Sequence, residues 1–259
     1  MCATCGCTDN GEIAFNEMAQ HGHQHHHSHV SGDLHQHGEK KMIEVEKDIL
    51  SGNKLLAERN RGYFLAKNIL AMNLVSSPGS GKTSLLECTL KTLNKEFIFY
   101  VIEGDQYTTN DADRIHATGT KVTQINTGKG CHLDAHMILH AVQGIKPVEN
   151  SVLFIENVGN LVCPAMFDLG EQERVVIMSV TEGEDKPLKY PDMFHTSSLC
   201  IINKIDLLPY VPFDIEKAKK YAWQVNPSLN ILEVSCTTGE GLTEWYSWLQ
   251  QKIPLVQTS

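Results

Sequence analysis

Short apolar stretches alternate with amphipathic segments along the chain from about residue 70 onwards. Continuous apolar runs are typical of buried strands, and apolar residues spaced three or four positions apart are typical of helices. The runs predict strands at 70–75, 97–103, 121–125, 151–155, 174–180, 198–202 and 230–234. The amphipathic segments predict helices after residue 84 and at 111–118, 132–142, 214–225 and 241–252. We therefore expect an α/β fold, with a mostly parallel sheet covered by helices on both faces.

A different pattern precedes the first strand. Charge density rises from Glu39, and apolar residues between Ile43 and Ile69 predict an amphipathic entry helix that breaks near Ser51-Gly52-Asn53. The segment before this helix is rich in cysteine and histidine, and too few apolar side chains are present to offset the entropy of ordering it. We expect a flexible metal-binding tail over residues 1–40 and a globular domain over residues 41–259.

The charge and the cysteine content narrow the class of protein. The 259-residue chain has a formal net charge of −9, which disfavours nucleic acid as a partner because phosphate binding needs a basic surface. No apolar run approaches the ~18 residues of a membrane span, and no signal-peptide apolar region opens the sequence. We expect a cytoplasmic protein with no membrane contact. In that reducing compartment, the eight cysteines indicate metal ligands better than disulfides.

A glycine-containing turn joins the first strand to the next helix, with the sequence Ser76-Ser77-Pro78-Gly79-Ser80-Gly81-Lys82-Thr83-Ser84. In such a turn, consecutive backbone N–H groups and the helix dipole bind phosphate. Lys82 brings a positive charge to the β/γ-phosphates, and the Thr83 hydroxyl can ligate Mg²⁺. Such motifs usually begin with glycine, whereas this one begins with Ser76. The sequence predicts a nucleotide cradle formed by Gly79, Ser80, Gly81, Lys82, Thr83 and Ser84.

The tetrapeptide Asn203-Lys204-Ile205-Asp206 follows the strand at 198–202. The Asp206 carboxylate can accept hydrogen bonds from guanine N1–H and the N2 amine together, and adenine offers neither donor. A site built on such bonds discriminates between bases by several orders of magnitude. The Lys204 stem can cover a face of the base, and the backbone N–H groups after Ser235 and Cys236 can reach guanine O6. We expect GTP as the substrate.

Acidic residues end two further strands, in Glu103-Gly104-Asp105 and Glu156-Asn157-Val158-Gly159. Parallel sheets bind ligands at the carboxyl ends of their strands. Asp105 can there reach Mg²⁺ or position water near the γ-phosphate, so we expect it to act in catalysis with Lys82 and Glu156. Glu156 replaces the aspartate that GTPases often carry, which leaves direct and water-mediated contact with Mg²⁺ both open. An ordinary strand-end carboxylate is the alternative in each case.

The first residues of the chain concentrate metal-binding side chains. Cys2, Cys5 and Cys7 lie within one short loop, and three thiolates, together with the terminal amine, suit a soft or borderline metal ion. Eight of the thirteen histidines follow, namely His21, His23, His25, His26, His27, His29, His35 and His37. Interspersed histidines of this kind bind several metal ions loosely. Incidental cysteines, a purification tag and a tail without metal function are the alternatives.

Another candidate metal site combines Cys131, His132 and the distant Cys163. A cysteine–histidine pair with a further cysteine is a good ligand set for a metal ion, but spacing alone does not place Cys163 beside the pair. His136 and His140 share a helical face with His132, and we expect them to form only a surface stripe. Two further cysteines, Cys88 and Cys200, are expected in the core.

Taken together, these motifs resemble the HypB family of nickel-handling GTPases in nickel-iron hydrogenase maturation. The resemblance rests on Cys2-x-x-Cys5-Gly6-Cys7, the histidine tract, the phosphate loop at 77–83, Glu103-Gly104-Asp105, the segment 126–136 from Asn126 to His136, the segment 156–164 from Glu156 to Pro164, and Asn203-Lys204-Ile205-Asp206. It covers the chain from about residue 42 to the end, with the terminal cysteine motif matching separately. The family also has serine at the first position of the phosphate loop, as here at Ser76.

The resemblance implies a P-loop NTPase of the SIMIBI class that dimerises when GTP is bound. It implies a tight nickel site at Cys2, Cys5 and Cys7, and an interface site for nickel or zinc at Cys131, His132 and Cys163. Hydrogenase maturation factors and the hydrogenase large subunit are the implied partners, with GTP and Mg²⁺ as further ligands. The variable histidine tract suggests nickel storage in addition to delivery.

Two other functions stay open from the sequence. A nickel storage or buffering protein with a secondary GTPase would bind many ions without regard to nucleotide. A urease-type nickel GTPase belongs to the same class, but the Cys2–Cys7 motif argues against it. Neither the acceptor protein nor the preference for nickel over zinc follows from these residues.

Overall fold

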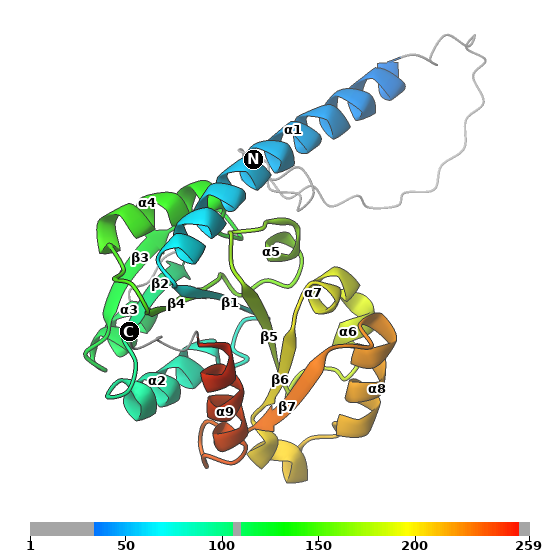
Figure 1. The fold of residues 1–259 in the computed structure, drawn as a ribbon. Helices are drawn as coiled ribbons and strands as arrows, with labels where there is room; N and C mark the ends of the chain where they lie inside the picture. The colour runs from blue at the N-terminus through cyan, green and yellow to red at the C-terminus, as the bar shows by residue number, and fades with distance from the viewer. Residues whose placement is uncertain (1–33, 106–109, 254–259) are drawn as a thin grey trace, which may run out of the picture. The chain divides into compact units, whose positions relative to one another are not determined.

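The computed structural model describes residues 34–105 and 110–253, and a seven-stranded parallel sheet organises this part of the chain (Figure 1). The strands are β1 (Leu70–Ser76), β2 (Phe99–Asp105), β3 (Lys121–Asn126), β4 (Val152–Glu156), β5 (Glu173–Ser179), β6 (Leu199–Asn203) and β7 (Asn230–Val234). Their order across the sheet is β3-β2-β4-β1-β5-β6-β7, and every neighbouring pair is parallel. The predicted α/β fold is confirmed. All carboxyl ends of the strands lie at one edge, where a ligand site is expected.

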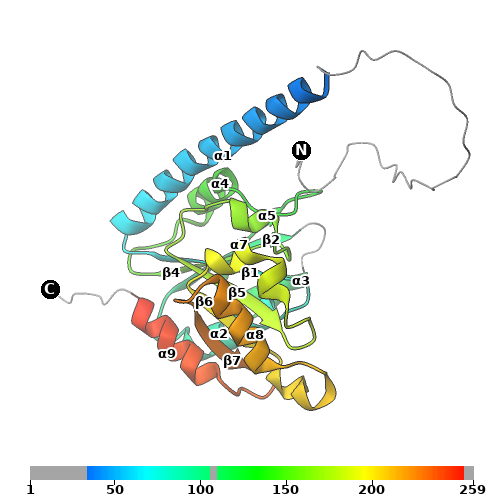
Figure 2. The same ribbon diagram turned by 90° about the vertical axis from the view of Figure 1, so that its right-hand side faces the viewer.

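Helices cover both faces of the sheet (Figures 1 and 2). On one face, α2 (Lys82–Leu93), α3 (Asn110–His116) and α9 (Leu242–Lys252) pack against the strands through Leu86, Ile115 and Trp245. On the other, α7 (Pro191–His195) and α8 (Ile215–Val225) do so through Phe194 and Ala222. The remaining short elements are α4 (Ala135–Ile145), α5 (Cys163–Met166), α6 (Lys186–Lys189) and the 3₁₀ helix η1 (Ile205–Tyr210). Each fully buried Leu, Ile or Phe contributes about 1.5–3 kcal/mol, so both layers hold the sheet firmly.

The entry helix does not break where the sequence suggested. Helix α1 runs continuously from Leu34 to Ala66, through the predicted break at Ser51-Gly52-Asn53. A glycine inside a helix costs only about 1 kcal/mol, which tertiary contacts readily offset. Asn53 supplies such contacts, because its side chain donates to Asp168 O and accepts from Ala135 N, at 2.8 Å in both cases.

Helix α4 starts later than predicted, at Ala135 rather than His132. Asp134 is its N-cap, and the Asp134 carboxylate accepts a hydrogen bond from Met137 N at 2.7 Å. An aspartate at this position satisfies a free N–H group of the first turn and so defines the start of the helix. His132 therefore lies in the preceding loop and does not share a helical face with His136 and His140.

The compact unit that carries the sheet begins at Gly52, and residues up to Ser51 belong to a separate unit. Among the described helices, none combines the length and the apolar character needed to cross a bilayer. The predicted thiolate site at Cys2, Cys5 and Cys7 lies outside the described residues, as does most of the histidine tract.

Candidate functional site

The phosphate loop connects β1 to α2 in the manner that the sequence predicted. Gly79 and Gly81 have positive φ angles of 72° and 100°, which side-chain-bearing residues rarely adopt. A Cβ atom on Gly81 would also lie 2.3 Å from Asn203 Nδ2, so this position requires glycine. The Asn203 amide donates to Ser80 O at 2.9 Å, and the Lys204 ammonium donates to Gly79 O at 2.6 Å. Asn203 and Lys204, at the end of β6, thus brace the phosphate loop from two strands away, since β5 lies between β1 and β6.

Lys82 lies inside this loop, with only 9% of its surface exposed. Its ammonium group donates to Ser76 Oγ at 2.7 Å, so the serine at the first loop position acts as a partner of the lysine. Burial lowers the pKa of Lys82, while the charges of Glu156 and Asp111 oppose that shift. A buried cation that donates to a neutral serine hydroxyl is well suited to receive an anionic phosphate.

A cavity of about 400 Å³ lies between the phosphate loop and the predicted base-recognition residues. The lining residues are Gly81, Ser84, Glu87, Cys88, Lys91, Asn203, Lys204, Asp206, Leu207, Cys236 and Thr237. Ser235 Oγ donates to Asp206 Oδ1 at 2.6 Å and thereby orients the carboxylate. The cavity gathers Asp206, Cys236 and Ser84 although they are far apart in the sequence. Its volume and polar lining fit a purine base and its sugar.

Two buried glutamates lie at the strand ends beside Lys82. Glu156 Oε1 accepts a hydrogen bond from Thr83 Oγ1 at 2.7 Å, and Glu103 is its register partner on β2. In the described part of the chain, the Oε2 atoms of both glutamates are buried and have no hydrogen-bond partner. Burial raises the pKa of both carboxyls; the pKa of Glu103 reaches about 8, with the Glu156 charge as the second cause. Two orphaned carboxyl oxygens beside a threonine hydroxyl form a suitable cation site.

Asp105 ends β2, two residues after Glu103, and is partly exposed. Its backbone carbonyl accepts from Thr127 N at 2.9 Å, which ties the end of β2 to the loop that precedes Cys131. The sequence predicts Asp105 and Glu156 as site residues, and the structure adds Glu103 to them. The alternation of the strand indicates this role, because residues 103 and 105 point to the same face.

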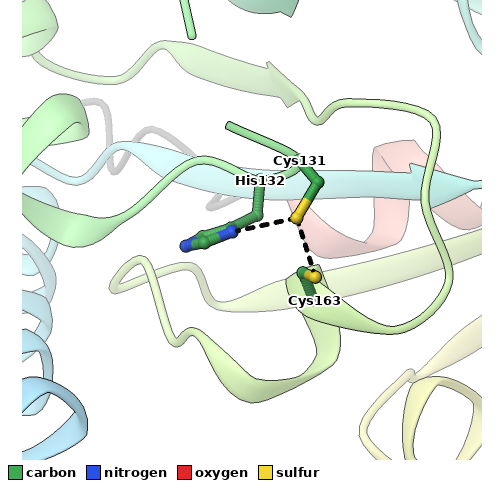
Figure 3. Close-up of side chains that lie close together, drawn as sticks. All are labelled: Cys131, His132 and Cys163. Atoms are coloured by element: carbon green, nitrogen blue, oxygen red, sulfur yellow. Dashed lines mark hydrogen bonds between the residues drawn. The ribbon is translucent and has the colours of Figure 1, made fainter. Parts of the chain in front are cut away.

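Cys131, His132 and Cys163 converge on one point (Figure 3), with their ligand atoms all within 4.8 Å of one another. The Cys131 and Cys163 sulfur atoms are 2.8 Å apart, and His132 Nδ1 lies 3.7 Å from Cys131 Sγ. Two thiolates on one metal ion, at bonds of ~2.3 Å, lie ~3.3–3.8 Å apart, so a small outward movement would accommodate an ion. The structure thus brings Cys163 to the pair, which spacing alone did not determine.

The surroundings of His132 fix the position of its ring and favour its neutral form. Its ring stacks on the Phe167 ring, with centroids 4.0 Å apart and an angle of 25° between planes. Burial lowers the pKa of His132, whereas the nearby Asp134 charge acts in the opposite direction. A neutral imidazole is the form that binds metal ions. Nothing in the sequence pattern pointed to Phe167, because it belongs to a loop with no periodicity.

The remaining candidates stay outside these sites or at their margin. His136 and His140 are exposed on α4 with their Nε2 atoms 3.0 Å apart. Cys200 is fully buried in β6, as expected for the core. Cys88 is only half-buried and lines the cavity, where its thiol contacts Cys236 O at 3.6 Å.

This chain is similar in sequence to proteins of one known family. The family model for the CobW/HypB/UreG nucleotide-binding domain matches residues 70–233. The chain is 56% identical over 230 residues to hydrogenase maturation factor HypB of Escherichia coli K12, covering 85% of this chain and 79% of that protein.

Two crystal structures of HypB proteins are similar to this chain. The structure from Archaeoglobus fulgidus is 42% identical, with a TM-score of 0.74, and the match covers 79% of this chain and all of that one. The structure from Helicobacter pylori, in complex with nickel, is 38% identical, with a TM-score of 0.73, and the match covers 78% of this chain and 94% of that one.

Proposed function

The chain belongs to the HypB family of hydrogenase maturation factors, and from this membership we propose that it is a GTP-hydrolysing nickel metallochaperone. It delivers nickel to the large subunit of nickel-iron hydrogenase, together with other maturation factors. One observation carries the proposal: Cys163 follows β4, whose last residue, Glu156, is bonded to Thr83 of the phosphate loop. The nucleotide and metal sites therefore share a chain segment.

Guanine recognition rests on Asp206, with Asn203 and Lys204 supporting the phosphate loop and the segment 235–237 closing the cavity. Lys82 holds the β/γ-phosphates, where its charge compensates the negative charge that develops in phosphoryl transfer. Asp105 and Glu156 orient the attacking water or the cation at the γ-phosphate. Hydrolysis then depends on positioning and electrostatics more than on covalent chemistry.

Mg²⁺ fits the residues at the strand ends. Thr83 Oγ1, Asp105 and the orphaned carboxyl oxygens of Glu156 and Glu103 would hold it. Bound there, Mg²⁺ would neutralise charge on the β- and γ-phosphate oxygens. The raised pKa of Glu103 agrees with this role, since a nearby cation would favour its charged form.

Nickel is the cargo of Cys131, His132 and Cys163. Two thiolates and a neutral imidazole suit nickel or zinc, and the nickel-bound structure of the Helicobacter pylori relative favours nickel here. We further propose that GTP brings two copies together with their triads facing each other. The tail adds a tight nickel site at Cys2, Cys5 and Cys7, and the histidine tract adds storage.

The proposal requires that nickel affinity at the triad depend on the nucleotide. We would replace Cys2, Cys5 and Cys7 by serine in the full chain and titrate nickel in a chelator buffer, which sets free nickel independently of the histidine tract. The thiolate-to-nickel charge-transfer band reports the triad alone. Affinities with GDP and with a non-hydrolysable GTP analogue should differ by ~5–150-fold, the usual range of such coupling.

Cys163→Ala should remove the band and the nucleotide dependence. Cys200→Ala is the matched control, because Cys200 is equally buried but lies in β6, outside the triad. Equal nickel affinity in both nucleotide states would make the triad a static site and contradict delivery driven by GTP. Light scattering in the same two states tests the dimer.

A further inference from the structure

The segment that links the nucleotide and metal sites contains a buried asparagine, Asn157, with 1% of its surface exposed. It follows Glu156 directly and lies two residues before Gly159, where an added Cβ would meet Pro78 Cα of the phosphate loop at 2.9 Å. The segment 156–159 thus touches the phosphate loop at both ends. Asn157 therefore lies in a segment that contacts the phosphate loop on both sides of it.

The Asn157 side chain reaches the metal-binding loop. Its Oδ1 accepts from Leu133 N at 3.2 Å and from Val158 N at 3.0 Å. Leu133 is the residue after His132 and is fully buried. Its side chain also packs so closely on β2 that a Cβ on Gly104 would lie 2.8 Å from it. Leu133 therefore contacts both strand ends, through its side chain at Gly104 of β2 and through its backbone N–H at Asn157, directly after β4.

A second set of contacts leads from Asn157 to the other half of the metal site. Asn157 Nδ2 donates to Asn73 Oδ1 at 3.3 Å, and Asn73 Nδ2 donates to Glu171 Oε1 at 3.1 Å. Glu171 forms a buried ion pair of 2.7 Å with Arg174. Arg174 in turn donates to Ala165 O and Phe167 O, which flank the turn after Cys163.

We propose that Asn157 is the positioning residue that couples nucleotide state to metal affinity, which rests on the function proposed above. Its oxygen holds the backbone on one side of the triad, and its amide nitrogen starts the chain of contacts through Asn73, Glu171 and Arg174 to the loop on the other side. Buried hydrogen bonds of this kind are costly to leave unmade, so the groups move together rather than separately. A change in the position of Glu156 between the GDP and GTP states is thereby transmitted to His132 and Cys163.

The test uses the same nickel titration of the full chain with serine at positions 2, 5 and 7. With Asn157 intact, the affinity ratio between GDP and GTP-analogue states should lie within ~5–150-fold. Asn157→Ala should bring that ratio close to one. A merely structural role would weaken both affinities equally and leave the ratio unchanged, which would overturn the proposal.

Asn226→Ala is the control, because Asn226 is a buried asparagine whose amide donates to Phe194 O and Ser197 O, at a distance from both sites in the sequence and the sheet. Its ratio of nickel affinities between the GDP and GTP-analogue states should equal that of the parent chain. If Asn226→Ala lost the nucleotide dependence as fully as Asn157→Ala, any loss of buried hydrogen bonds would suffice to remove coupling. That result would contradict a specific role for Asn157.

If Asn157→Ala does not fold, Asn157→Asp takes its place. The aspartate keeps an oxygen that can accept from Leu133 N, loses the donor to Asn73 and places a buried negative charge beside Asn73 Oδ1. It should lower the affinity ratio between the two nucleotide states, because the path through Asn73 is broken, and an unchanged ratio would refute the proposal. Equal affinities in the parent chain would refute both proposals, whereas coupling that survives Asn157→Ala refutes only this one.

Discussion

Asp206→Asn tests guanine recognition most directly. In the structure, Ser235 Oγ donates to Asp206 Oδ1 at 2.6 Å, and the carboxylate faces the cavity between α2 and β6. The amide oxygen of asparagine can keep the bond to Ser235, so the substitution should leave the fold intact. It places an NH₂ group where guanine N1–H and the N2 amine need an acceptor.

The expected loss follows from the bonds that are removed. Hydrogen bonds to a charged group contribute roughly 1.5–3 kcal/mol each, so losing two weakens GTP binding by about 3–6 kcal/mol. Because Asp206 is half-exposed, water compensates part of this loss, and we expect the lower end, a decrease of about 100-fold. Xanthosine triphosphate carries an acceptor at C2 and should bind the variant better than it binds the parent.

The assay is displacement of a fluorescent nucleotide by GTP, ATP and xanthosine triphosphate, with hydrolysis measured in parallel. Asp192→Asn, at an exposed aspartate of α7 outside the cavity, should leave all three affinities unchanged. Full GTP preference in Asp206→Asn would refute the base-recognition assignment. Loss of GTP preference in Asp192→Asn would mean that the effect comes from the change in net charge and not from a lost contact with the base.

Three further changes test other parts of the chain. Lys82→Ala should reduce GTP hydrolysis at least ~100-fold while nickel binding at Cys2–Cys7 persists, and equal loss of both would contradict separate modules. Deleting residues 20–38 should lower nickel stoichiometry in equilibrium dialysis several-fold without changing GTP turnover; an unchanged stoichiometry would end the storage proposal. Glu103 has its pKa raised by burial to about 8, so its protonated form stabilises the metal-free, nucleotide-free protein below pH ~4.5, and this contribution is lost as pH rises through about 8. Glu103→Gln should therefore flatten the fall in Tm between pH 5 and 8.5, and parallel curves for variant and parent would show that this carboxyl is not perturbed.

The sequence by itself determined the sheet and the position of the phosphate loop. Every predicted strand is present with bounds within two residues, because continuous apolar runs such as residues 152–155 of β4 are stable only when buried on both faces. The phosphate loop was also predictable, because its left-handed backbone positions at Gly79 and Gly81 favour glycine. The assignment of Asp206 to guanine stays a prediction. Short helices without periodicity, such as α5 and α7, were not predicted.

Tertiary structure alone decided which distant residues meet. The break predicted near Gly52 is absent because Asn53 bonds to residues that lie over 80 positions away. Cys163 joins Cys131 and His132 because β4 and the loop after β3 emerge at one edge of the sheet. The partners of Asn157 were likewise invisible, since a side-chain amide bonds to whatever donor the packing brings near. The local pattern of apolar and polar residues determines where strands and helices form. The packing of these elements on the sheet determines which distant side chains come into contact.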